Sequence, residues 1–282
     1  MLFEFKNYYL IKIMKKTFLL IAAFASLALS VNAQKKDKPY KEIFYKDIVK
    51  ESDDMSISTN NGVSNKEMTK FKLKIVNKTN DILLYKPEES SFKLESKEVQ
   101  PKEKWLYIYP NESDFRVVNG VGSDYLYPYT YVVDGVYKIP TNGKGIETPE
   151  FQLPASQNEF TTGGFTCVMT SLTKESDLTE VKFECRYNGD KIGVIQPSRA
   201  AVKLPDGTEI ANEKSKSQPV IVMKGKSEKI TLKWNRMEGG RAQDMQKIKM
   251  NILWRNTFSE VDAEKLKEEM LQFEIDEKLS KR

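Results

Sequence analysis

Hydrophobic and polar residues alternate in short runs along most of the chain. Residues 71–75 (Phe-Lys-Leu-Lys-Ile) and residues 181–185 (Val-Lys-Phe-Glu-Cys) are two clear cases. Turn-forming residues follow both runs, at 77–81 and 187–191. A period of two is typical of β-strands that bury one face. The pattern therefore predicts an all-β protein with antiparallel sheets.

The strand pattern occurs twice, at an offset of 110 residues. Met55–Leu94 aligns without a gap with Phe165–Leu204; few residues are identical, but the apolar positions and the turns coincide. With small insertions the match extends to 127–133 against 248–254, and to 150–153 against 272–275. Each copy then holds about seven short strands separated by turns, which predicts two tandem antiparallel β-sandwiches.

In strand number, strand spacing and turn chemistry, the chain resembles the immunoglobulin-like (fibronectin type III-like) β-sandwich modules of exported bacterial proteins. The resemblance is one of fold alone, because the Cys…Trp…Cys pattern of antibody domains is absent. It implies a role in binding, adhesion or scaffolding, although such sandwiches host many functions.

The first 33 residues have the pattern of a signal peptide. Lys15 and Lys16 precede the uncharged run Thr17–Ser30, and Val31–Ala33 provides a cleavage site with a small residue. We expect cleavage after Ala33 and true initiation at Met14. The alternative is a membrane anchor, but the run is shorter than the about 20 residues that span a bilayer. No cysteine follows the cleavage site, so the protein is not expected to be a lipoprotein.

These patterns divide the chain into six parts. We expect a signal peptide at 1–33, an N-terminal segment at 34–50, a first sandwich at 51–154, a linker at 155–164, a second sandwich at 165–277 and a tail at 278–282. In this scheme Phe151–Leu153 closes the first sandwich and Leu271–Asp276 closes the second. A short helix near the C-terminus is predicted at Asp262–Met270, with Ser259 as its N-cap.

Composition narrows the classes of function. The chain of 282 residues has no histidine and only two cysteines, which excludes Ser–His–Asp catalysis, Cys–His catalysis and histidine-bound zinc. The formal net charge is +5, but removal of residues 1–33, with four lysines and one glutamate, leaves +2. We therefore expect no nucleic-acid partner, no cofactor, no metal and no catalytic residues, and no transmembrane span in the mature chain.

The two cysteines align with core positions of the other copy. Cys167 and Cys185 correspond to Ile57 and Ile75, and they lie on consecutive predicted strands around one turn. Cross-strand neighbours are close enough for their side chains to touch. In an oxidising compartment a disulfide is expected, and two buried free thiols are the alternative.

Aromatic residues recur at alternate positions of two predicted strands, and so project from one face of each. They are Trp105, Tyr107, Tyr109, Tyr125, Tyr127, Tyr129 and Tyr131. They are the candidate binding surface, either a platform for sugar rings or a contact for a protein. The alternative is an aromatic core, which the aligned residues of the second copy (Ile248, Met250, Ile252 and Trp254) favour. Pro128 indicates an edge strand or a bulge.

Two functions from different classes remain. The first is a non-catalytic, periplasmic or secreted module of the cell envelope that binds a protein partner or has a structural role. The second is a carbohydrate-binding protein that uses the aromatic residues. An enzyme with paired carboxylates is the weakest hypothesis, because nothing in the sequence marks a convergent pair.

Overall fold

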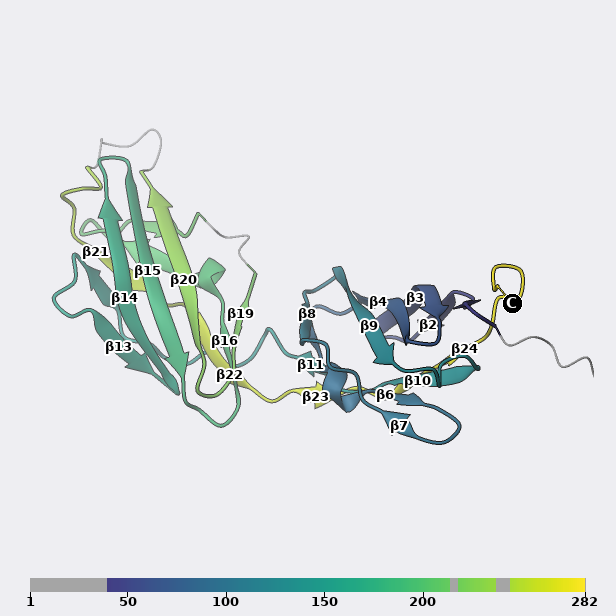
Figure 1. The fold of residues 1–282 in the computed structure, drawn as a ribbon. Coiled ribbons are helices and arrows are strands. Elements are labelled where there is room, and N and C mark those ends of the chain that lie inside the picture. The colour runs from purple at the N-terminus through teal and green to yellow at the C-terminus, as the bar shows by residue number, and fades with distance from the viewer. Residues whose placement is uncertain (1–39, 214–217, 237–243, 282) are drawn as a thin grey trace, which may run out of the picture. The chain divides into compact units, whose positions relative to one another are not determined.

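The computed structural model describes residues 40–213, 218–236 and 244–281 (Figure 1). Within them, residues Glu42–Ser280 form one compact unit. The predicted signal peptide and the start of the predicted N-terminal segment lie outside the described residues. The prediction of an all-β protein with antiparallel sheets is confirmed, since every strand pair among these described residues is antiparallel.

Four strands and a short 3-10 helix occur twice with the same boundaries, shifted by 110 residues. The first series is β3 (Met55–Ser64), β4 (Met68–Asn77), β5 (Ile82–Tyr85), η1 (Pro87–Glu89) and β6 (Ser91–Lys93). The second is β14 (Phe165–Lys174), β15 (Leu178–Tyr187), β16 (Ile192–Ile195), η2 (Pro197–Arg199) and β17 (Ala201–Lys203). We call the sheets built on these two series the first repeat and the second repeat.

Three sheets make up the first repeat. One has the order β1-β3-β4-β9, with β2 also on β3; the others have the orders β24-β10-β6-β7 and β23-β11-β5-β8. The additional strands are β1 (Ile43–Phe44), β2 (Ile48–Glu51), β7 (Glu98–Val99), β8 (Leu106–Ile108), β9 (Ser113–Val121), β10 (Tyr129–Val133), β11 (Val136–Ile139), β23 (Glu264–Lys265) and β24 (Glu269–Phe273).

The second repeat has three corresponding sheets. Their orders are β13-β14-β15-β20, β12-β21-β17-β18 and β19-β16-β22. The additional strands are β12 (Phe151–Leu153), β13 (Glu159–Thr162), β18 (Glu209–Ala211), β19 (Val220–Val222), β20 (Ser227–Asn235), β21 (Met250–Leu253) and β22 (Phe258–Val261). β1 and all of β2 except Glu51 thus lie in the segment expected to precede the first sandwich, and β13 lies in the segment expected to be a linker.

The two repeats exchange their closing strands, and here the sequence prediction is wrong. β12 pairs with β21 of the second repeat, with Leu153 opposite Met250. β24, from the end of the chain, pairs with β10 of the first repeat, with Phe273 opposite Tyr129 (Figure 1). The hydrophobic pattern of a strand identifies its buried face, but it does not say which of two similar sheets receives it.

The short helix predicted at Asp262–Met270 is absent, and its proposed N-cap Ser259 lies in β22. Within this segment β23 pairs with β11 instead. Lys265 Nζ forms ion pairs with Glu89 (3.1 Å) and Asp134 (2.9 Å) of the first repeat. An isolated helix of this length is marginal, so strand pairing and these contacts override its helix-forming residues.

In the part of the chain that the structure describes, no helix has seven or more residues. None of the helices found there is long and apolar enough to cross a membrane.

Each exchanged strand contributes large side chains to a buried core. Phe273 contacts Phe71, Tyr45 and Tyr129, with ring centroids 4.6, 5.4 and 4.7 Å away. In the second repeat, Phe151 lies 5.2 Å from Phe183 and belongs to a buried cluster that draws on several sheets. The packed sheets are consistent with a β-sandwich fold.

Candidate functional site: an open seam in the first repeat

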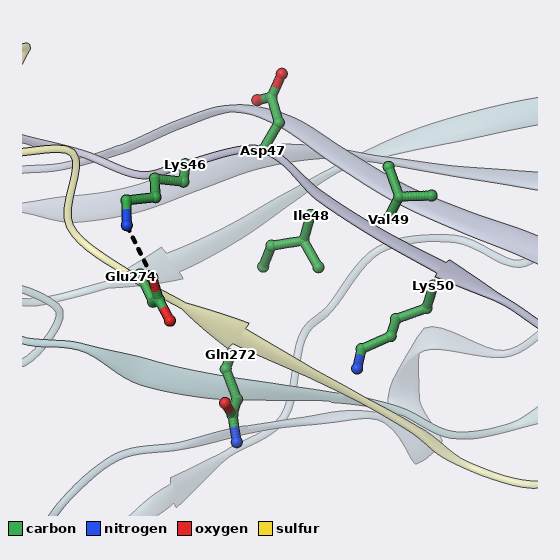
Figure 2. Close-up of a pocket in the computed structure, with 7 residues that line it drawn as sticks. All are labelled: Lys46, Asp47, Ile48, Val49, Lys50, Gln272 and Glu274. Atoms are coloured by element: carbon green, nitrogen blue, oxygen red, sulfur yellow. Dashed lines mark hydrogen bonds and ion pairs between the residues drawn. The ribbon is translucent and has the colours of Figure 1, made fainter.

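Two edge strands of the first repeat border a groove. β2 pairs only with β3, and β24 pairs only with β10, among the strands that the structure describes. At one end the two segments are joined, because the Lys46 N–H donates to the Glu274 carbonyl and Tyr45 bridges to Ile275. Beyond that point β2 and β24 are close but unpaired, and between them is a groove of about 350 Å³ (Figure 2). We call this groove the seam. Its lining residues are Lys46, Asp47, Ile48, Val49, Lys50, Gln272 and Glu274.

The alternation of an extended strand decides which side chains face the seam. Figure 2 shows Lys46, Ile48 and Lys50 directed towards β24, whereas Asp47 and Val49 project to the other side. Ile48 is half-buried and provides the apolar part of the lining. Lys46 and Lys50 bring two cations to the rim.

The corresponding seam of the second repeat is filled by an aromatic ring. Phe160 lies opposite Cys167, and Lys50 lies opposite Ile57, so the two residues occupy equivalent positions. Phe160 is buried, with ring centroids 4.9 Å from Trp254 and 5.5 Å from Phe151. Lys50 is exposed and cannot occupy that space as a cation without losing hydration.

The strand across the seam carries one phenylalanine and one leucine in each repeat, at exchanged positions. By strand register, Leu271 of β24 corresponds to Phe151 of β12, because each lies opposite the middle of its partner strand, at Tyr131 and Ile252. By the same register Phe273 corresponds to Leu153, so the difference that leaves the first-repeat seam open is Lys50 in place of Phe160.

One ion pair spans the rim of the seam. Lys46 Nζ lies 2.9 Å from Glu274 Oε2, and this hydrogen bond raises the pKa of Lys46 above its ordinary value. Lys46 therefore remains charged at neutral pH. Among the described residues, no ion pair is found for Lys50.

The seam is suited to binding an extended chain. A strand edge without a neighbour offers backbone N–H and C=O groups to an incoming strand. The half-buried Ile48 can accept an apolar side chain, and Lys50 can accept an acidic one. The described residues contain no group of three or more Cys, Asp or Glu side chains arranged to hold a metal ion.

Three of the candidate aromatic residues lie in the core of the first repeat. Tyr125, Tyr129 and Tyr131 are at most 5% exposed. The Tyr131 hydroxyl hydrogen-bonds to that of Tyr85 at 2.8 Å, and the Tyr129 hydroxyl to that of Thr69 at 3.1 Å. Burial raises the pKa of Tyr85 to about 12 and those of Tyr129 and Tyr131 well above 10.

The other four candidates lie in three different surroundings. Tyr127 is 67% exposed, because β10 begins only at Tyr129 and the alternation does not extend through Pro128. Tyr107 and Tyr109 are half-buried against an apolar cluster, and burial raises the pKa of each. Trp105 is 38% exposed and donates its indole N–H to Glu88 at 2.5 Å. The seven aromatic residues therefore do not form one exposed surface.

The cysteines lie on adjacent strands of the second repeat. Cys167 in β14 is directly opposite Cys185 in β15. In the structure they form a disulfide, and both are buried.

The seam was not identified from the sequence. A usable signal was present, because the 110-residue offset also aligns β2 with β13 and places Lys50 against Phe160. The aligned segments begin at Met55 and Phe165, which follow Lys50 and Phe160 in their respective copies. The alignment therefore does not include the lysine-for-phenylalanine difference.

A comparison with protein-family models found no matching family, and a comparison with curated proteins found no match.

Proposed function

We propose that this chain is a non-catalytic, exported module of the cell envelope, built from tandem immunoglobulin-like sandwiches, that binds a protein partner through the first-repeat seam. The proposal rests on the antiparallel sheets, on the repeat, and on a leader sequence of the signal-peptide type. We propose that the mature chain begins at Gln34 and resides in the periplasm or outside the cell. An intact mass of envelope-derived protein that still included residues 1–33 would rule out this processing.

The observation that carries the proposal is the difference between the two seams. The repeats share their strands and registers, yet one seam is filled by Phe160 and the other is left open beside Lys50. The buried Phe160 ring adds apolar contacts that stabilise the second repeat, and the first repeat forgoes this contribution. A groove that receives an extended segment of a partner accounts for that loss.

Site-specific photo-crosslinking in the envelope tests the proposal. A photoreactive amino acid replaces Lys50 in one variant and Thr161, an exposed residue on the equivalent edge of the second repeat, in the control. We expect a discrete protein adduct at position 50 and none at position 161. No adduct at position 50, or the same adducts at both positions, contradicts the proposal.

The carbohydrate-binding alternative has little to support it. Of the seven aromatic candidates, only Trp105 and Tyr127 are exposed by more than a third of their surface. Nothing places these two side by side, so we do not extend this alternative.

A further inference from the structure

The outward face of the first-repeat sheet β2-β3-β4-β9 carries a row of lysines on its central strand β4. Lys70, Lys72 and Lys74 occupy alternate positions of that strand. Alternate residues of a strand project from the same face, with a spacing of about 6.8 Å. In the described part of the chain, none of the three forms an ion pair. The row is therefore a line of uncompensated positive charge.

Apolar side chains lie next to this row. Phe115 and Val117 of the neighbouring strand β9 are opposite Lys74 and Lys72, and they are 45% and 46% exposed. Val121, further along the same strand, is 85% exposed. Lys72 Nζ lies 4.0 Å from the centroid of the Phe115 ring, a cation–π contact that joins the two strands.

On its other side the face continues to the edge strand β2. Val49, which is 64% exposed, lies opposite Ser58, and Ser58 lies opposite Lys74. One row across the sheet thus begins and ends with an exposed apolar side chain and has a lysine within it. Exposed apolar residues grouped with charges mark an interaction site rather than an ordinary solvated surface.

The second repeat shows what the same face looks like when its charges are balanced. Glu180, Lys182 and Glu184 stand where the first repeat has its three lysines. Their partners on β20 are Lys233, Thr231 and Lys229, so each glutamate faces a lysine. β15 has the same length and the same position in its sheet as β4 without these lysines, so the scaffold does not require the lysine row.

We propose that this face of the first repeat, the Lys70/Lys72/Lys74 row with its apolar neighbours, is a docking surface for an acidic protein strand. Acidic side chains at alternate positions of an extended strand have the same spacing as the lysines. The methylene groups of those acidic side chains would pack on Phe115 and Val117, which share the lysines' face. Charge complementarity sets the partner's chemistry and orientation. This surface shares only Val49 with the lining of the seam, and it does not depend on the function proposed for the seam.

Binding of a synthetic probe tests the proposal. The probe is the fluorescein-labelled peptide Thr-Glu-Val-Glu-Val-Glu-Thr, and its control is a peptide of the same composition with the three glutamates adjacent. The purified protein is compared with the triple variant Lys70→Glu, Lys72→Glu, Lys74→Glu. A matched variant on the second repeat carries Lys182→Glu, Lys229→Glu and Lys233→Glu. Unchanged thermal unfolding of each variant shows that it folds.

We expect salt-sensitive binding of the alternating peptide to the unmodified protein and to the second-repeat variant. The first-repeat variant should bind roughly tenfold more weakly or worse, since three exposed charge pairs are lost. No binding, equal loss in both triple variants, or equal binding of the control peptide overturns the proposal. Retention on vesicles of one part phosphatidylglycerol to three parts phosphatidylcholine, without peptide binding, overturns it in favour of a lipid surface.

The experiments distinguish failure of the lysine-row proposal from failure of the seam proposal. A Lys50→Phe variant, which closes the seam, should bind the alternating peptide as the unmodified protein does. Conversely, the lysine-row variant should keep the crosslink at position 50.

Discussion

Phe273, at the end of the chain, stacks on Tyr129 in the core of the first repeat, with ring centroids 4.7 Å apart and an interplanar angle of 15°. The two residues are opposite each other on paired strands. The first repeat therefore completes its core with a strand that follows the whole of the second repeat. Its folding needs contacts between residues distant in sequence, which raises the entropic cost of closing the chain.

The buried Phe273 should therefore be important for stability. Phe273→Ala is expected to lower the free energy of unfolding by about 3–5 kcal/mol, as for other large-to-small changes of buried phenylalanine. The control is Met270→Ala on the same strand, where the side chain is 47% exposed and the expected cost is under about 1 kcal/mol. Urea unfolding followed by tryptophan fluorescence measures both, and equal losses would show that β24 does not pack in this core.

Exchanging the residues of the two seams should change the free energy of unfolding by unequal amounts. Phe160→Lys removes a ring packed on Trp254 and places an ammonium group in apolar surroundings, so we expect a loss of more than about 3 kcal/mol. Lys50→Phe replaces an exposed side chain beside an open groove, and its effect should stay within about 1 kcal/mol. Calorimetric unfolding compares the two, and a comparable loss in both would contradict the difference between the seams.

Reduction of the disulfide should destabilise the second repeat. Cys167 and Cys185 are 18 residues apart, and release of a loop of this size is expected to cost about 3 kcal/mol. Dithiothreitol should lower the urea midpoint of the unmodified protein. It should leave that of a Cys167→Ala, Cys185→Ala variant unchanged. Alkylation of both cysteines in the unfolded but unreduced protein would instead show that no disulfide was present.

Alkaline pH should unfold the first repeat because of its buried tyrosines. Burial raises the pKa of Tyr45 and of Tyr85 to about 12, so the folded protein holds these protons more tightly than the unfolded chain does. Their contribution to stability is complete below pH 10 and is lost as the pH rises towards 12. Each unit in that window costs about 1.4 kcal/mol per buried tyrosine.

Two spectra recorded during one alkaline titration measure this effect. Absorbance at 295 nm reports tyrosine ionisation, and circular dichroism reports the sheets. Ionisation of the core tyrosines should coincide with loss of structure. Complete ionisation near pH 10 with the sheets intact would contradict their burial.

Individual strands and their buried faces could be predicted from the sequence more fully than the pairing of strands that are far apart in the sequence. Alternation at 71–75 and 181–185 identified strands, and the apolar alignment of Cys167 and Cys185 placed both side chains in the core. These are properties of a strand and its own two faces. The side of each strand that is buried follows directly from period two.

Features set by distant contacts could not be predicted in this way. The segment Asp262–Met270 has helix-forming residues, but β11 and the carboxylates around Lys265 hold it extended. Tyr127 fits the alternation of Tyr129 and Tyr131, yet it lies before the strand begins and faces solvent. The open seam lies between Lys50 of β2 and Gln272 of β24, which are far apart in the sequence.

The most direct test of the account is the affinity of the partner that crosslinks at position 50, measured by calorimetry with the unmodified protein and with Lys50→Phe. Thr161→Phe on the second repeat is the matched control. The account predicts binding at least about tenfold weaker for Lys50→Phe, because the ring occupies the space that the partner enters. It predicts no change for Thr161→Phe. Equal affinity of the unmodified protein and Lys50→Phe would contradict the central claim that the seam is the binding site.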